Sequence, residues 1–259
     1  MQHSRPALAR AHTLLPWLLL AALGARPAGA LDLGSGFALG GDAVLTSDYV
    51  YRGVSSSNNE AALQGDLHVM NAGSFLGVWG STRDNQLEPY ANFDLEVYLG
   101  HRFDLSNAWS ATVSARAHYL LGGPQETSDD YQELGASVSY LDLWTLSVTA
   151  IPSAVRYWET YYGYERLSRA PAFVAETSFQ WLLHAGFYLT GGAGYYHVTG
   201  TGPGIEAANG YPYGNVGIAY DHHPWRVDVG YYRTGDKAQR LFPYPSADHQ
   251  VAASVAWRF

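Results

Sequence analysis

Ionisable side chains recur at every second position in several segments of this sequence. Successive side chains of a β-strand point to opposite faces, so residues two apart share a face. Charged groups gathered on one face can neutralise one another as ion pairs, or line a water-filled passage and select the ions that enter it. The clearest pairs are Asp66 and His68, Asp94 and Glu96, Arg116 and His118, and Arg226 and Asp228.

Nucleophilic catalysis is the second chemistry to weigh, because Ser114 and His118 fall on the same face of one predicted strand. Four residues of strand span about 13 Å, whereas a nucleophile and its base must lie within hydrogen-bond reach. Residues 31–259 also lack the Gly-x-Ser-x-Gly turn of many hydrolases. A triad assembled from different strands stays open, but the sequence favours a protein that is not an enzyme and has no catalytic residues.

Metal and cofactor motifs are equally weak in this sequence. His222 and His223 are adjacent in a predicted turn, where neighbouring side chains point apart, and neither a His-x-x-Glu-His motif nor a cysteine pair occurs. The glycines of residues 191–194 precede no helical pattern, so they do not form a phosphate-binding loop. The net charge of −8 argues against nucleic-acid binding. We therefore expect no metal, no cofactor and no nucleic-acid partner.

The carboxyl-terminal ten residues show the element that must position these groups. Their apolar residues occupy alternate positions, namely Val251, Ala253, Val255, Trp257 and Phe259. This period of two predicts a strand with one apolar and one polar face. The terminal Phe259, with Trp257 two residues earlier, resembles the closing strand of bacterial outer-membrane β-barrels. We therefore interpret these two aromatic residues as the signal that the barrel-assembly machinery reads.

Similar alternation defines about twelve strands, the first running from Ala43 to Arg52 and the last ending at Phe259. The connections alternate in length. Short turns are predicted at residues 71–73, 104–107, 141–143, 181–184 and 221–224. Longer polar loops are predicted at residues 55–60, 83–89, 122–130, 156–169, 199–210 and 234–248. Short turns on one side and long loops on the other are typical of membrane barrels, so we predict an all-β fold, a transmembrane antiparallel up-and-down β-barrel of about 12 strands.

Composition and the amino terminus agree with this prediction. Charged residues make up 15% of the chain, against about a quarter in soluble domains, while aromatic residues reach 14%. Arg5 and Arg10 precede the apolar residues 14–23, and Ala28-Gly29-Ala30 forms a small-residue cleavage site. A membrane anchor is the alternative, but this apolar run is short and interrupted by a proline. We predict a cleaved secretory signal peptide at residues 1–30 and the barrel at residues 31–259.

Aromatic residues near the predicted strand ends suit the girdles that membrane barrels place at the headgroup level. On this interpretation Tyr49, Tyr51 and Trp79 face outward. Six further residues are assigned to the girdles, namely Tyr119, Trp144, Tyr220, Trp225, Tyr231 and Trp257.

Residues 47–55, SDYVYRGVS, give the sequence its most specific resemblance to a known family. Residues 62–67, 77–81 and 94–100 add shorter matches. In these segments the chain resembles the TorF-type porins of proteobacteria, earlier catalogued as a domain of unknown function. The resemblance implies an outer-membrane barrel with a pore. It supplies no agreed substrate and no settled functional residues.

The predicted strand faces direct thirteen ionisable side chains into the lumen. They are Asp48, Arg52, Asp66, His68, Asp94, Glu96, Arg116, His118, Glu133, Glu176, Arg226, Asp228 and Arg258. Seven are acids and four are arginines, which predicts a weak preference for cations, although mutual ion pairing is the simpler role.

We expect a channel in the outer membrane of a Gram-negative cell, in contact with membrane lipid, through which small polar solutes or ions diffuse passively. A barrel that presents its loops for binding or adhesion is the first alternative, with aromatic residues at 157–164 and 241–245 as its recognition surfaces. A barrel enzyme that acts on lipid is the third.

Overall fold

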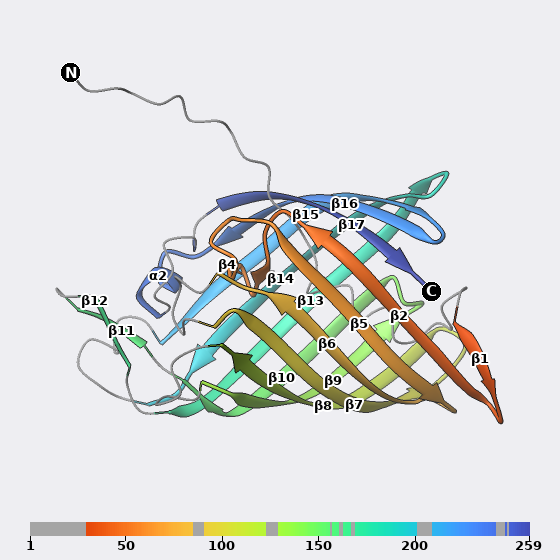
Figure 1. The fold of residues 1–259 in the computed structure, drawn as a ribbon, viewed down its shortest axis with the longest axis horizontal. Helices are drawn as coiled ribbons and strands as arrows, with labels where there is room; N and C mark the ends of the chain where they lie inside the picture. The colour runs from red at the N-terminus through yellow and green to blue at the C-terminus, as the bar shows by residue number, and fades with distance from the viewer. Residues whose placement is uncertain are drawn as a thin grey trace, which may run out of the picture.

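In the computed structural model the described residues form one antiparallel sheet, in which twelve strands close into a barrel and a short thirteenth strand pairs with one of them (Figure 1). The structure describes residues 30–84, 91–122, 129–155, 157–160, 163–166, 169–200, 209–241, 247 and 249–259. The wall strands are β2 (Phe37–Thr46), β5 (Ala62–Asn71), β6 (Ser74–Thr82), β7 (Phe93–Asp104), β8 (Trp109–Leu121), β9 (Tyr131–Tyr140), β10 (Trp144–Ala154), β13 (Ala170–His184), β14 (Phe187–Val198), β15 (Gly210–His222), β16 (Trp225–Thr234) and β17 (His249–Arg258). Each pairs with the next, and β17 pairs with β2 to close the barrel. The predicted fold class is therefore confirmed.

Smaller elements lie at the two ends of the wall and inside it. β1 (Leu31–Gly34) extends the edge of β2, and α2 (Ala238–Leu241) follows β16. The hairpins β3–β4 (Val50–Tyr51 and Val54–Ser55) and β11–β12 (Tyr157–Thr160 and Gly163–Arg166) are separate two-stranded sheets.

Along most of their length, the wall strands alternate outward-facing apolar side chains with inward-facing side chains that are mostly polar. In β16, Val227, Val229 and Tyr231 are exposed, whereas Arg226 and Asp228 are buried. Outward-facing leucine and valine side chains reach exposed fractions near 60%, which water would penalise and lipid would not. A lipid environment also explains why the sheet closes into a barrel, because a sheet in hydrocarbon must pair every backbone N–H and C=O. Within the part of the chain that the structure describes, no helix is long and apolar enough to cross a bilayer.

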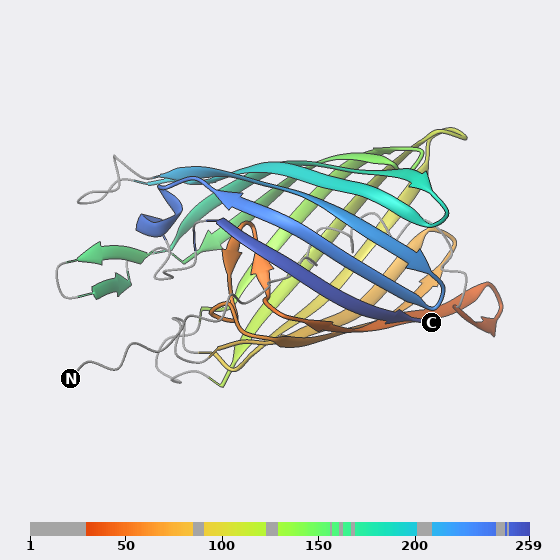
Figure 2. The same cartoon turned by 90° about the horizontal axis from the view of Figure 1, so that it is seen from above.

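The connections sort by length at the two ends of the barrel, as predicted (Figure 2). Ala72-Gly73 and Ala185-Gly186 are two-residue turns in which both φ angles are positive, the geometry of a type I′ hairpin. The turn predicted at residues 181–184 is wrong, because β13 continues to His184. The apolar Trp181, Leu182 and Leu183 are all exposed at that end of the strand. The alternation of apolar and polar residues therefore ends before the strand ends, and the sequence pattern places the turn too early.

The first wall strand ends six residues earlier than the sequence predicts. β2 stops at Thr46, and the chain from Ser47 to Ala61 turns into the interior, where it forms the β3–β4 hairpin. Asp48 and Arg52 therefore project from this inner segment and not from the wall. The alternation of residues 47–52 did not reveal the difference, because a hairpin strand and a wall strand have the same period of two.

Three aromatic residues assigned to the outer girdles lie inside the barrel: Tyr49 and Tyr51 because they belong to the inner segment, and Trp79 because it is on the lumen face of β6. Tyr49 and Trp79 are 2% and 5% exposed, and their rings are 5.5 Å apart. Tyr51 donates a hydrogen bond to Glu133 across the lumen. The other six predicted girdle residues are exposed, namely Tyr119, Trp144, Tyr220, Trp225, Tyr231 and Trp257.

The barrel closes where β17 meets β2, with Arg258 opposite Asp42 and Ser254 opposite Thr46. Beyond this ladder the Phe259 amide donates to the Gly41 carbonyl at 3.0 Å, and the Gly41 amide donates to the Phe259 carbonyl at 3.2 Å. A Cβ at Gly41 would lie 2.9 Å from the Phe259 ring and closer still to the Asp66 carbonyl. Only glycine fits at this seam.

Replacing Gly41 by alanine is therefore expected to lower the free energy of unfolding by about 1–3 kcal/mol, the usual cost of overpacking. Gly65→Ala is the matched control, because a Cβ there meets only the Asp42 carbonyl at 3.5 Å, an ordinary contact. Urea titration of the folded barrel in detergent, followed by the gel-mobility shift of unfolding, measures both variants. Equal stability of the two would contradict a tight seam.

Candidate functional site

The β3–β4 hairpin has the tightest turn that two antiparallel strands allow. Tyr51 pairs with Val54, so only Arg52 and Gly53 form the turn, with φ of 49° and 78°. A type I′ turn requires positive φ at both residues and usually has asparagine at the first. Arginine in the left-handed region is strained by about 1–2 kcal/mol. The tip must therefore be held by its surroundings.

The base of the hairpin is tied together by its own side chains. Asp48 is fully buried and accepts hydrogen bonds from the hydroxyls of Ser55 and Ser57, the second at 2.7 Å. The Ser56 amide donates to the Tyr49 carbonyl at 2.6 Å. Both hydroxyls bond Oδ1 of a carboxylate that would be costly to bury alone, and these bonds make the segment a compact unit within the barrel.

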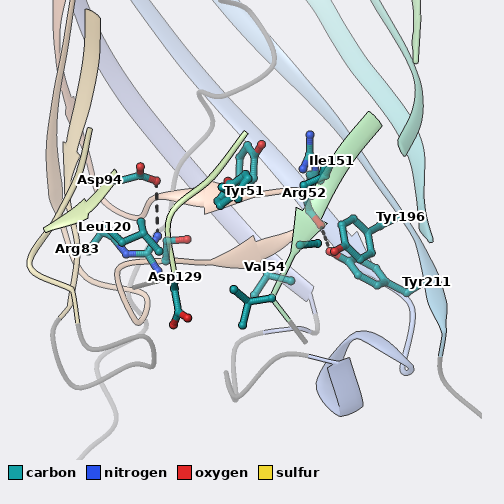
Figure 3. Close-up of a pocket in the computed structure, with 14 residues that line it drawn as sticks. Tyr51, Arg52, Val54, Arg83, Asp94, Leu120, Asp129, Ile151, Tyr196 and Tyr211 are labelled. Atoms are coloured by element: carbon teal, nitrogen blue, oxygen red, sulfur yellow. Dashed lines mark hydrogen bonds and ion pairs between the residues drawn. The ribbon is translucent and has the colours of Figure 1, made fainter. Parts of the chain in front are cut away.

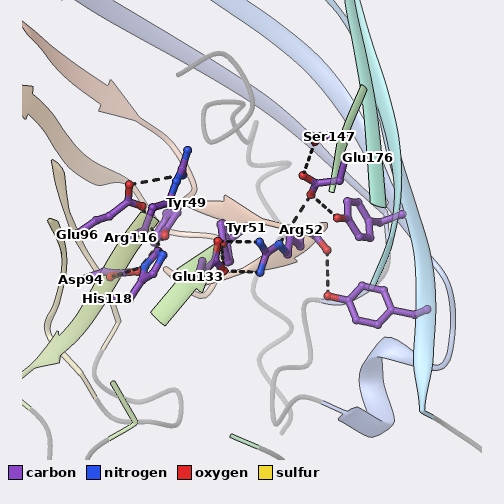
Figure 4. A network of polar contacts seen from close by, with 12 residues as sticks. Tyr49, Tyr51, Arg52, Asp94, Glu96, Arg116, His118, Glu133, Ser147 and Glu176 are labelled. Carbon is purple, nitrogen blue, oxygen red and sulfur yellow. Dashed lines mark hydrogen bonds and ion pairs between the residues drawn. The ribbon is translucent and has the colours of Figure 1, made fainter. Parts of the chain in front are cut away.

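Arg52 joins this unit to one side of the barrel (Figure 4). Its guanidinium donates to both carboxylate oxygens of Glu133 on β9, at 2.8 and 3.1 Å, and its Nε lies 3.8 Å from Glu176 on β13. Burial acts to lower the pKa of Arg52, but Glu133, Glu176 and the neighbouring tyrosines together outweigh burial and hold that pKa well above its ordinary value. Arg52 is therefore a permanent cation in the lumen.

The opposite side of the tip packs against β15 and β16. The Tyr211 hydroxyl donates to the Arg52 carbonyl at 3.2 Å, and the Thr234 hydroxyl donates to the Gly53 carbonyl. A Cβ at Gly53 would lie 2.8 Å from the Cβ of Tyr213. The hairpin thus spans the lumen from β9 and β13 to β15 and β16.

A second cluster of ionisable groups lies beside the hairpin, on β7 and β8. The Tyr49 hydroxyl donates to Asp94 at 3.0 Å, and Arg83 lies 3.7 Å from the same carboxylate. His118 lies 3.7 Å from Asp94 and 3.5 Å from Glu96. Its ring stacks on Tyr131, with centroids 4.3 Å apart.

The hairpin tip separates two cavities, because Tyr51 and Arg52 are the two residues that line both. The outer cavity, on the side of the long loops, is shown in Figure 3 and is lined by Tyr51, Arg52, Val54, Ser56, Arg83, Asp94, Leu120, Asp129, Tyr131, Ile151, Ala154, Val155, Tyr196 and Tyr211. The inner cavity is lined by Tyr51, Arg52, Thr112, Ser114, Arg116, Glu133, Gly135, Ala136, Ser137, Ser147, Val148, Thr149 and Glu176. The site can therefore restrict what passes from one cavity to the other.

The thirteen sequence-predicted lumen residues form two groups. Eight surround the hairpin or belong to it, namely Asp48, Arg52, Asp94, Glu96, Arg116, His118, Glu133 and Glu176. The other five lie nearer the short turns, namely Asp66, His68, Arg226, Asp228 and Arg258. There Arg226 donates to Asp228 at 2.9 Å, and Arg258 donates to Asp221 at 2.6 Å. Asp66 accepts hydrogen bonds from Tyr98 and lies 2.5 Å from His68.

Sequence reasoning missed the residues that hold the hairpin in place, namely Tyr49, Tyr51, Gly53, Arg83, Tyr131 and Tyr211. The Arg52-Gly53 dipeptide between alternating residues was the available signal, since glycine at the second position favours a type I′ turn.

Other predictions lie partly or wholly outside the described residues. They are the aromatic side chains of residues 157–164, most of the 241–245 segment, and the signal peptide up to residue 29. Trp257 and Phe259 lie at the closing seam, and their role as an assembly signal stays a prediction. Among the described side chains, no group of three or more His, Asp or Glu could hold a metal ion.

This geometry defines the class of the protein, a transmembrane β-barrel, and comparison with solved structures agrees with the barrel fold. Residues 30–257 match the bacterial family Gcw_chp, described as a protein family of unknown function, and the chain belongs to it. A comparison with curated proteins gives no match.

Solved structures share the barrel at low sequence identity. A NanC porin superposes with a TM-score of 0.50 at 11% identity, covering 85% of this chain and 97% of the porin. A structure titled for the in-meso crystallization of membrane proteins gives a TM-score of 0.54 at 10% identity, covering 85% and 83%. At such identities the likeness establishes the fold alone.

Proposed function

We propose that the protein is an outer-membrane channel through which small polar solutes or ions diffuse passively, a porin of the TorF type within its family. The observation that carries the proposal is the hairpin spanning the lumen of a closed barrel, with a cavity on each side of it. A segment fixed by ion pairs and hydrogen bonds to five wall strands, namely β7, β9, β13, β15 and β16, narrows a passage without replacing the wall. The proposal includes export with removal of residues 1–30 and assembly through the carboxyl-terminal strand.

The charges around the hairpin support a cation preference. Six carboxylates line this region or brace the hairpin, namely Asp48, Asp94, Glu96, Asp129, Glu133 and Glu176. Three guanidinium groups face them, namely Arg52, Arg83 and Arg116. An excess of carboxylates at a constriction raises the local concentration of cations and disfavours anions.

Single-channel recording of refolded residues 31–259 in a planar bilayer tests this function. We expect discrete conductance steps, and a reversal potential in a KCl gradient that shows K⁺ to be more permeant than Cl⁻. A folded barrel without steps would contradict the channel. Steps that favour Cl⁻ would contradict the charge argument while leaving the channel intact.

A further inference from the structure

The two cavities differ in chemistry. Nine of the fourteen residues that line the outer cavity are tyrosine, valine, leucine, isoleucine or alanine. Ile151, Leu120 and Val54 provide aliphatic surface there, and Tyr131 and Tyr211 provide aromatic rings. The inner cavity is lined largely by serine, threonine and charged residues. A passage for simple ions needs no apolar outer vestibule, so the outer cavity has the composition of a ligand site.

Asp94 supplies this cavity with an unused hydrogen-bond acceptor. The residue is 2% exposed and lines the cavity, where Figure 3 shows it beside Arg83. Its Oδ2 accepts the Tyr49 hydroxyl, but its Oδ1 accepts no hydrogen bond from the residues that the structure describes. His118 Nδ1 lies 3.7 Å from this oxygen, too far for a hydrogen bond. A buried carboxylate oxygen without a hydrogen bond is costly, so a ligand that donates a hydrogen bond to it would be stabilised.

The charges around the cavity favour a donor that is positive. The Arg52 guanidinium lies on the boundary of the cavity and contacts Glu133 and Glu176, and Arg83 is paired with Asp94 at 3.7 Å. The cavity lining holds two carboxylates, Asp94 and Asp129, and two guanidinium groups. Both guanidinium groups already have carboxylate partners among the described residues, which leaves the charge of Asp94 to favour a cation. Tyrosine rings attract cations through their faces, which adds to the same preference.

We propose that the outer cavity binds small organic cations that carry an aromatic or aliphatic body, with the ammonium group at Asp94 Oδ1 and the body against Tyr131 and Ile151. The inference rests on the channel function proposed above and names the class of solute that the channel admits from the loop side.

A set of matched ligands tests the proposal on the unaltered protein. The probes are 2-phenylethylamine, 2-phenylethanol, phenylacetate and methylammonium, titrated into the detergent-solubilised barrel by calorimetry against protein-free micelles. We expect 2-phenylethylamine to bind about tenfold more tightly than each of the other three, because only it combines the charge with the ring. Equal binding of phenylacetate would overturn the charge preference, and equal binding of methylammonium would overturn the role of the apolar lining.

Variants locate the ammonium group. Asp94→Asn is expected to remove the preference for 2-phenylethylamine over 2-phenylethanol. Ser147→Ala in the inner cavity is expected to leave the preference unchanged. A loss of preference in this variant would show that the ligand binds in the inner cavity and would overturn the proposal. If Asp94→Asn does not fold, Ile151→Ser provides a second test and is expected to weaken 2-phenylethylamine and 2-phenylethanol alike.

Calorimetry and bilayer recording separate this inference from the channel function. A barrel that conducts but does not bind 2-phenylethylamine would overturn the ligand site alone. A barrel that binds it with the expected preference but shows no conductance steps would retain the site and overturn the channel.

Discussion

Replacing Gly53 by valine is expected to raise the single-channel conductance several-fold. Gly53 lies at the tip of the hairpin with φ of 78°, and any Cβ there collides with Thr234 and Tyr213 on the barrel wall. The tip can then no longer dock against β15 and β16. The two cavities that Arg52 and Tyr51 now separate would merge into a wider passage.

Gly34→Val is the matched control for this change. Gly34 has φ of 79°, so valine there carries the same backbone strain, but nothing lies within 4 Å of the Cβ position. We expect conductance close to that of the unaltered protein. Recordings in which both variants leave conductance unchanged would show that the hairpin does not limit the current. Gel mobility before and after heating confirms that each variant forms the barrel.

The wall of this barrel could be predicted from sequence because lipid and lumen impose opposite demands on adjacent residues. Val227 and Val229 must face lipid, which places Arg226 and Asp228 inside without further information. The rule uses only the nearest neighbours in the chain. This rule therefore predicts most strand faces correctly, and with them the outward position of six of the nine aromatic residues assigned to the girdles.

The site itself could be predicted only in part, because its contacts join distant segments. Arg52 meets Glu133 over a separation of 81 residues, and Tyr211 meets the Arg52 carbonyl over 159. Such partners depend on barrel closure and on the inward course of residues 47–61, neither of which alters the local period of two. The sequence therefore indicated many of the internal charges, although not Arg83 or Asp129, and the structure indicates which of them are paired.

Replacing Glu133 by glutamine is expected to lower the free energy of unfolding by about 3 kcal/mol, since it leaves the Arg52 guanidinium buried without its main partner. The two side chains are 8% and 3% exposed. The same change is expected to reduce the K⁺ over Cl⁻ preference, because it removes a carboxylate and uncovers a fixed cation. Urea titration measures the first effect and the reversal potential in a KCl gradient the second.

The control for Glu133→Gln is Asp142→Asn, which removes the carboxylate from the Arg102–Asp142 pair near a short turn. That pair has the same bidentate geometry, at 2.9 and 3.1 Å, but its side chains are 17% and 29% exposed. Water can solvate the remaining arginine, so a cost below about 1 kcal/mol is expected. Similar costs at the two sites would show that Arg52 is solvated and that the lumen beside the hairpin is wide.

The double variant Arg52→Met with Glu133→Gln separates the roles of the pair. Removing both charges should recover most of the stability that Glu133→Gln loses, because the cost of that change arises from an uncompensated cation. Conductance should nevertheless rise, since methionine cannot reach across the lumen to β9 with two hydrogen bonds. A double variant with recovered stability and unchanged conductance would mean that the fixed shape of the hairpin, held through Gly53 and Asp48, narrows the passage without help from the ion pair.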